Sequence, residues 1–213
     1  MIQVVVYFVS WLLWTLGVAW FSVHLLKPHY GSPYPFHLMY TPSFFNHFMH
    51  WDAFWYTYIG LYGYRYTKTE LPTVAFFPGY PLIIRFIHSI VGENTALLYI
   101  LPAVIFQGGA IYIMYLLLRD LNKKDSTVYF TLLAFCFYPG SFFGMTGYPV
   151  SALTFFAVSC FYFLRKKRWF LSSLMAGTGT LFGPLAVFLA VVVFFEVLRY
   201  KGKRSVVLYG LLS

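Results

Sequence analysis

Residues Ile2–Leu26 read IQVVVYFVSWLLWTLGVAWFSVHLL, and these 25 residues include no Lys, Arg, Asp or Glu. A helix needs about 20 apolar residues to cross the hydrocarbon core of a bilayer. The run is longer than the apolar part of a secretory leader, follows no basic residue and lacks a small-residue cleavage site. It therefore predicts an uncleaved transmembrane helix.

The composition extends this prediction to the whole chain of 213 residues. Hydrophobic residues make up 60% of it and charged residues only 10%. The mean hydropathy is +0.70, which is too high for a surface that faces water on all sides. The sequence thus predicts an all-α integral membrane protein with no soluble domain.

The positive charge of the chain is concentrated at the ends of apolar runs. The formal net charge is +9, and eleven of the 15 Lys and Arg residues form three clusters. Short basic loops mark the cytoplasmic side of membrane proteins and favour anionic headgroups, so we expect membrane lipids as partners and no nucleic acid. The clusters are Arg119, Lys123 and Lys124; Arg165 to Arg168; and Arg199, Lys201, Lys203 and Arg204.

Three cytoplasmic clusters require an even number of crossings between them, which predicts a polytopic bundle of about six spans. We expect a first transmembrane helix over 1–26, an external loop with interfacial helices over 27–92, and a transmembrane helical bundle over 93–213. Residues 205–213 begin another apolar segment, so we expect the bundle to continue past them. The later crossings are predicted at 95–118, 127–143 and 148–164, with two short ones in 169–198 that turn at Gly183-Pro184, a pair that breaks helices.

Gly and Pro gather at the predicted outer turns, at 138–140, 147–149 and 183–184. Broken backbone at membrane depth persists only where protein packs around it or water fills a cavity. The pattern therefore predicts an outward-facing cavity.

The external loop carries most of the histidines and an isolated acid, Asp52. Within it, aromatic and apolar residues recur at three- and four-residue spacing, which predicts one interfacial helix with a single apolar face. On this helical wheel Asp52 falls at the edge of the apolar face. The face consists of Phe44, Phe48, Trp51, Trp55, Tyr58, Ile59 and Tyr62.

No metal site is predicted. His47 and His50 share a face of the expected helix without a third ligand, and His50 lies opposite Asp52. The two histidines are therefore interpreted as polar interface residues. Cys136 and Cys160 both lie in apolar runs, where lone thiols are usually core residues.

Asp52 has two interpretations. Partial desolvation beside a membrane raises the pKa of a carboxylate and makes it a better base. An isolated acid at this depth is also commonly a helix cap or a headgroup contact.

Four segments bear on this choice, because they resemble the GPI mannosyltransferase II family and its bacterial relatives in the same order along the chain. The first is similar to the family run W-D-x-x-W-Y-x-x-I-A-x-x-G-Y, and the second is similar to F-F-P-x-Y-P. The segments are HWDAFWYTYIGLYGY (50–64), FFPGYPLIIRFI (76–87), FYPGSFFGMTGYPVSALTFF (137–156) and the stretch after RKKRWFLSSLMAG (165–177).

The resemblance implies a GT-C glycosyltransferase fold and the transfer of a hexose from a polyprenyl-phosphate carrier. Mannose is the hexose that the family transfers. Asp52 matches the acid that acts as base on the acceptor hydroxyl. No metal or other cofactor is implied. For the phosphate, the resemblance implies Arg85 first and Arg65, Lys68 and His88 as weaker candidates. For the sugar, it implies His50, Trp51, Trp55 and Tyr56.

Each of these residues also has a plainer interpretation. The cations can be headgroup contacts, and the aromatic side chains can form an interfacial belt. The implied location is the cytoplasmic membrane with an extracytoplasmic active face, or the endoplasmic reticulum membrane in a eukaryote.

The chain departs from the family in its outer turns. The Ser-Glu pair that follows the family's Gly-Tyr turn is replaced by Pro149-Val150-Ser151, and Thr-Arg-Pro is replaced by Phe182-Gly183-Pro184. These losses support a second hypothesis, a catalytically inactive relative that binds other membrane subunits. A small transporter is a weaker third hypothesis, because the predicted transmembrane runs from residue 95 onward contain no acid except Glu196.

Overall fold

The computed structural model describes residues 2–25, 43–66, 73–93, 95–121 and 123–201. Within these ranges the regular structure consists of α-helices and short 3-10 helices, without a strand. The all-helical prediction is confirmed for this part of the chain. The helices, in order, are α1 (Ile2–Leu25), η2 (Phe44–Phe48), α2 (Asp52–Tyr62), η3 (Thr73–Ala75), α3 (Gly79–Val91), α4 (Ala96–Asp120), α5 (Asp125–Phe137), η4 (Pro139–Met145), α6 (Val150–Arg165), α7 (Trp169–Thr180), η5 (Pro184–Ala186) and α8 (Val187–Lys201).

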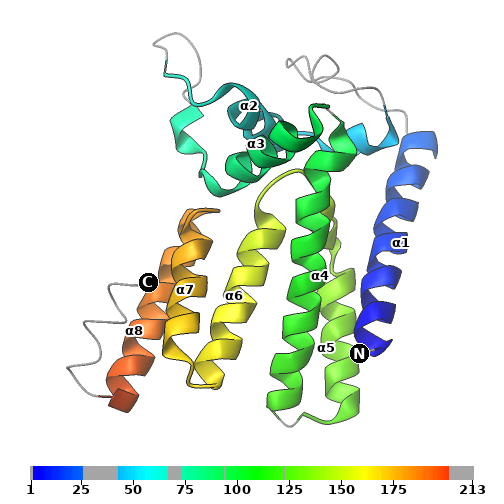
Figure 1. Cartoon of the computed structure of the whole chain (residues 1–213). Coiled ribbons are helices and arrows are strands. Elements are labelled where there is room, and N and C mark those ends of the chain that lie inside the picture. The colour runs from blue at the N-terminus through cyan, green and yellow to red at the C-terminus, as the bar shows by residue number, and fades with distance from the viewer. Residues whose placement is uncertain (1, 26–42, 67–72, 94, 122, 202–213) are drawn as a thin grey trace.

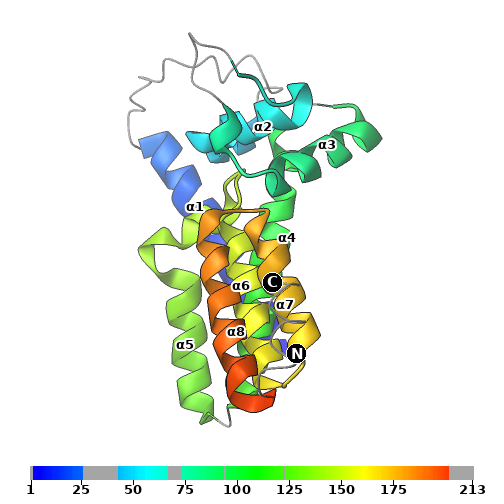
Figure 2. The same cartoon turned by 90° about the vertical axis from the view of Figure 1, so that its left-hand side faces the viewer.

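The helices form an upright bundle with a cap at one end. In Figure 1 α1 and α4 to α8 run up and down, while α2 and α3 lie over the upper end of the bundle. Figure 2 shows the same arrangement from the side, with α8 toward the viewer and α5 at the left edge of the bundle. The described parts of the predicted external loop, 43–66 and 73–92, thus form a layer on one end of the bundle, here called the external layer.

Helix α4 is the centre of the bundle, and two adjacent glycines let its neighbours approach closely. A Cβ atom at Gly108 would stand 3.0 Å from the Phe8 ring of α1, and one at Gly109 would stand 2.9 Å from the Phe155 ring of α6. Successive residues of a helix point about 100° apart. Gly108 therefore serves the contact with α1 and Gly109 the contact with α6.

Within the described ranges, two helices are long and apolar enough to cross a membrane, α1 and α4, and α5 with η4 gives a third if a bent pair counts as one span. The predicted spans at 1–26 and 95–118 agree with α1 and α4. The predicted crossing over 127–143 corresponds to α5 and η4, which are bent by 70° relative to each other and stay a candidate for one span. Pro139 follows the bend, and proline cannot continue the hydrogen-bond ladder of α5.

The remaining upright helices are shorter. α6, α7 and α8 have 16, 12 and 15 residues, and at about 1.5 Å per residue each spans less than the roughly 30 Å of a hydrocarbon core. The chain does break at Gly183 and Pro184, between α7 and η5. The predicted total of about six spans stays a prediction.

The described parts of the three basic clusters lie at one end of the bundle, as the sequence predicts. Asp120, the last residue of α4, pairs with Arg165 through Nε at 3.3 Å and also with Lys166. The Lys167 ammonium lies 4.9 Å from the centre of the Tyr200 ring in α8. This end is opposite to α2 and α3 (Figure 1). Lys203 and Arg204 lie outside the described residues.

Candidate functional site

The predicted single interfacial helix over residues 44–62 is wrong, because η2 ends at Phe48 and α2 begins at Asp52. Trp51 between them has φ 52° and ψ −125°, a backbone conformation that is costly for a residue with a side chain. The break buries the Met49 side chain, which is 1% exposed. Met49 packs so closely on Gly147 that a Cβ atom added to Gly147 would overlap the Met49 sulfur.

The residues of the predicted apolar face differ in their burial, since Phe48 and Ile59 are only 5% and 2% exposed. The buried residues of α2 are Ala53, Phe54, Tyr56, Thr57, Ile59 and Gly60. A Cβ atom at Gly60 would stand 2.7 Å from Ile84 of α3. The small residue Gly60 allows α2 and α3 to approach closely. Other residues of the predicted face remain open, with Trp51 64% and Tyr62 65% exposed.

Asp52 begins α2 at the end of the molecule opposite to the basic clusters. Its side chain is exposed, and its place in the first turn is favourable for a negative charge. The residue before it, Trp51, occupies the N-cap position without a side-chain cap hydrogen bond, so Asp52 is a first-turn acid and not the cap itself.

The charge of Asp52 reaches two buried phenols. Burial, with a contribution from Asp52, raises the pKa of Tyr56 to about 12. Burial likewise raises the pKa of Tyr148 to about 12, with Asp52 adding to the shift. Tyr56 lies on α2 and Tyr148 on the turn before α6, so Asp52 is close to both the external layer and the bundle.

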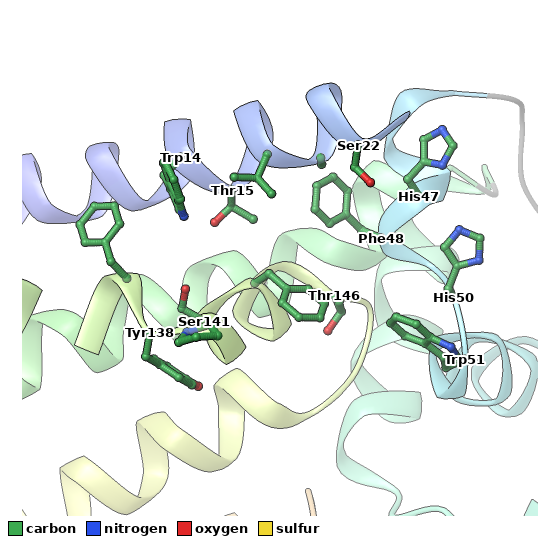
Figure 3. A pocket seen from close by; sticks show the side chains of 15 residues that line it. Trp14, Thr15, Ser22, His47, Phe48, His50, Trp51, Tyr138, Ser141 and Thr146 are labelled. Carbon is green, nitrogen blue, oxygen red and sulfur yellow. The ribbon is translucent and has the colours of Figure 1, made fainter. Parts of the chain in front are cut away.

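A cavity of about 470 Å³ opens next to this site, between α1, η2 and the turn from α5 to η4 (Figure 3). Its volume lies within the range of small-molecule sites. Its walls are mainly apolar and aromatic, and His50 and Trp51, the two residues before Asp52, close one end. The lining residues are Trp14, Thr15, Val18, Ala19, Ser22, His47, Phe48, His50, Trp51, Phe137, Tyr138, Pro139, Ser141, Phe142 and Thr146.

Of the outer turns predicted from the sequence, that of Tyr138 and Pro139 lines this cavity. The other two outer turns pack directly on the external layer. The backbone N–H of Gly147 donates to the Phe48 carbonyl at 3.1 Å, and the N–H of Gly79 donates to the Leu181 carbonyl at 2.7 Å.

The cavity contains a small set of polar groups. The Thr15 hydroxyl is buried without a hydrogen-bond partner, which is uncommon for a native protein. The rings of His47 and His50 lie 6.2 Å apart. Burial lowers the pKa of both, with His24 contributing at His47 and His47 contributing at His50, so both imidazoles are biased toward the neutral form that can donate or accept a hydrogen bond.

Sequence reasoning missed the contribution of α1 to this cavity. Thr15 and Ser22 are seven residues apart and therefore share a face of α1, and both line the cavity. Two hydroxyls at this spacing within an apolar run are the sequence feature that could have predicted a cavity beside α1.

The cations expected to bind phosphate lie away from Asp52. Arg85 donates from Nε to the Gly60 carbonyl at 3.0 Å, and Arg65 donates from Nη1 to the Tyr58 hydroxyl at 2.7 Å. Gly60 lies eight residues after Asp52 on α2, which corresponds to about 12 Å along the axis. Arg85 and Asp52 are therefore not brought together.

The other two cations do not join them. His88 Nδ1 lies 3.4 Å from the Tyr99 hydroxyl, at the contact between α3 and α4. Lys68 lies outside the described residues.

The three aromatic residues expected around a sugar differ in their availability. Tyr56 is 8% exposed and packs edge-on against Phe76 and Tyr80. Trp55 is stacked on Phe76, with ring centres 6.2 Å apart. Trp51 alone of the three lines the cavity.

Among the described residues, no group of three or more His, Cys, Asp or Glu side chains could hold a metal ion. The chain matches no family model, no curated protein and no solved structure.

Proposed function

We propose that this chain is a polytopic membrane glycosyltransferase of the GT-C type, which moves a hexose such as mannose from a polyprenyl-phosphate carrier to an acceptor on the extracytoplasmic side. The observation that supports the proposal most is the cavity that ends at His50 and Trp51, beside the exposed carboxylate of Asp52. An apolar cavity next to an acid at the outer end of a membrane bundle suits a lipid-borne sugar.

In this proposal the carrier enters along α1. Trp14, Val18 and Phe142 supply apolar walls for the first units of a polyprenyl chain. The chain would approach from the bilayer, because Leu13 and Phe21 of α1 are exposed on the surface of the bundle. The sugar then lies at the other end, next to Trp51, whose exposed ring offers a face for stacking.

The transfer needs one base and no oxidant or reductant. The acceptor hydroxyl oxygen attacks the anomeric carbon and gives its proton to Asp52. The bond between the anomeric carbon and the carrier phosphate oxygen breaks, and the phosphate leaves with the electron pair. The configuration at the anomeric carbon is inverted, because attack and departure occur on opposite faces.

The leaving phosphate requires hydrogen-bond donors at the end of the cavity next to Trp51. His50 and His47 line this end, and a neutral imidazole can donate one hydrogen bond to a phosphate oxygen. Arg85 lies too far along α2 to reach the same phosphate in this arrangement. The proposal therefore assigns the phosphate to His50, and assigns Arg85 to the contact between α2 and α3.

The test is transfer of labelled mannose from polyprenyl-phosphate mannose by the purified chain in lipid, with a mixture of lipid and sugar acceptors. Loss of a general base lowers the rate by about 10²–10⁴-fold, so Asp52→Asn should lose transfer to that extent. Glu93→Gln, which removes a second exposed carboxylate near α3, is the matched control and should transfer at the wild-type rate. Equal transfer by wild type and Asp52→Asn would contradict the assignment.

The second candidate is a catalytically inactive relative that serves as a subunit of a larger membrane complex. Two outer turns are closed against the external layer through Gly79 and Gly147, and the polar residues that the resemblance expects in these turns are absent. The outcome that favours this candidate is no turnover by the wild type, together with co-purification in a fixed ratio with other membrane proteins.

A further inference from the structure

A second groove of about 470 Å³ lies at the basic end of the bundle, between α6 and α8. Its apolar part includes Phe161, Val192 and Phe195, and its charged rim includes Arg165 and Lys167. We propose that this groove binds one anionic glycerophospholipid, with the phosphate of the headgroup on the two cations and an acyl chain along the apolar wall.

The charge of the rim is arranged for an anion. Arg165 keeps half of its side chain exposed, at 52%, while its Nε contacts Asp120. Lys167 extends over the Tyr200 ring, an arrangement that leaves ammonium hydrogens available to a ligand. The one acid in the groove, Glu196, has Arg199 3.8 Å away, which offsets its repulsion of an anion.

The apolar wall distinguishes a lipid from a soluble anion. Phe161 is 43% exposed, Val191 is 47% exposed and Phe195 is 62% exposed. A free phosphate would gain nothing from these side chains, whereas an acyl chain buries them. Basic pockets between membrane helices on the cytoplasmic side are recurrent sites for anionic headgroups.

The position of the groove makes the inference independent of the proposed transferase. Arg165 ends α6, whereas Asp52 and the cavity beside it lie at the opposite end of the bundle (Figure 1). A lipid in the groove would bridge α6 and α8, which meet mainly through α7.

The test measures how much phosphatidylglycerol stays bound to the full chain in detergent, by native mass spectrometry, with phosphatidylcholine as the zwitterionic reference. Lys167→Gln and Arg165→Gln should each weaken phosphatidylglycerol binding about fivefold, the effect expected for one cation near a membrane surface. Arg168→Gln removes the same charge from the next residue, which does not line the groove, and should bind as the wild type does.

The apolar wall is tested by a second pair of variants. Phe195→Ser should weaken binding, whereas Phe194→Ser, one residue away and outside the groove, should not. Equal losses in Lys167→Gln and Arg168→Gln would reduce the effect to general charge attraction and overturn the proposal. Equal retention of phosphatidylcholine, or displacement of the lipid by millimolar inorganic phosphate, would overturn it as well.

Discussion

Gly79 and Leu181 join the external layer to the bundle through their backbones. The N–H of Gly79 donates to the Leu181 carbonyl at 2.7 Å, and a Cβ atom at Gly79 would stand 2.7 Å from that same oxygen. Only glycine allows this approach, because a side chain would push the first turn of α3 away from the turn after α7.

Gly79→Ala is therefore expected to destabilise the chain. Insertion of one carbon into a tight contact usually costs about 1–3 kcal/mol, and here the opposing atom is backbone and cannot rotate away. The measurement is the midpoint of thermal unfolding in detergent. Gly17→Ala is the control, since a Cβ atom there meets nothing within 4 Å, and a loss in that variant equal to the loss in Gly79→Ala would refute the explanation.

The arrangement of charges predicts which residues can be labelled from each side of a membrane. Cysteines that replace Lys124 and Arg168 should react with a membrane-impermeant maleimide from one side of a sealed vesicle, and a cysteine in place of Glu93 should react from the other. Cys136 and Cys160 are buried and would first be replaced by alanine. Labelling of Lys124→Cys and Glu93→Cys from the same side would be incompatible with the bundle described above.

The pair His47 and His50 predicts a pH-dependent stability. Their pKa values in the folded chain lie below the ordinary value, which is about 6.5. As the pH falls from that value toward the folded pKa values, the unfolded chain binds more protons than the folded chain, so stability is lost. Unfolding midpoints at pH 7.5 and 5.5 should therefore differ.

The double variant His47→Gln/His50→Gln isolates this effect. Its midpoint should fall less than that of the wild type between the two pH values, because both titrating groups have been removed. An equal fall in both proteins would assign the pH dependence to other groups.

Arg85 is expected to act on stability more than on transfer. Its Nε–H bond to the Gly60 carbonyl links α3 to α2, and loss of one such hydrogen bond costs about 1 kcal/mol. Arg85→Leu should therefore lower the unfolding midpoint while kcat/KM for the lipid-linked sugar stays close to the wild-type value. A rise in KM for the donor at unchanged stability would instead return Arg85 to the phosphate, as the resemblance implied.

The sequence predicted the features of this fold that depend on composition. An unbroken apolar run defines α1, and the basic clusters at the ends of apolar runs share one end of the bundle. Pairs such as Gly183-Pro184 mark chain breaks because proline has no backbone N–H to continue a helix. These signals act within a few residues and need no knowledge of packing.

The features that depend on contacts between distant residues could not be predicted in the same way. The break at Trp51 follows from the packing of Met49 on Gly147, a contact across 98 positions of the chain. The inward face of α2 follows from the fit of Gly60 on Ile84. A helical wheel treats the segment as one continuous helix, and it therefore could not show that η2 and α2 are separate elements.

If the cavity beside Asp52 holds the lipid carrier, a benzophenone-bearing polyprenyl phosphate should crosslink to its walls on irradiation. The label should fall on cavity residues of α1 or η4, such as Trp14 or Phe142, and Ala19→Trp, which fills the cavity, should abolish it. Gly17→Trp, on an open face of α1, should leave the label in place. A label found only on the outer surface of α1, and unchanged by Ala19→Trp, would show that the carrier does not bind in the cavity.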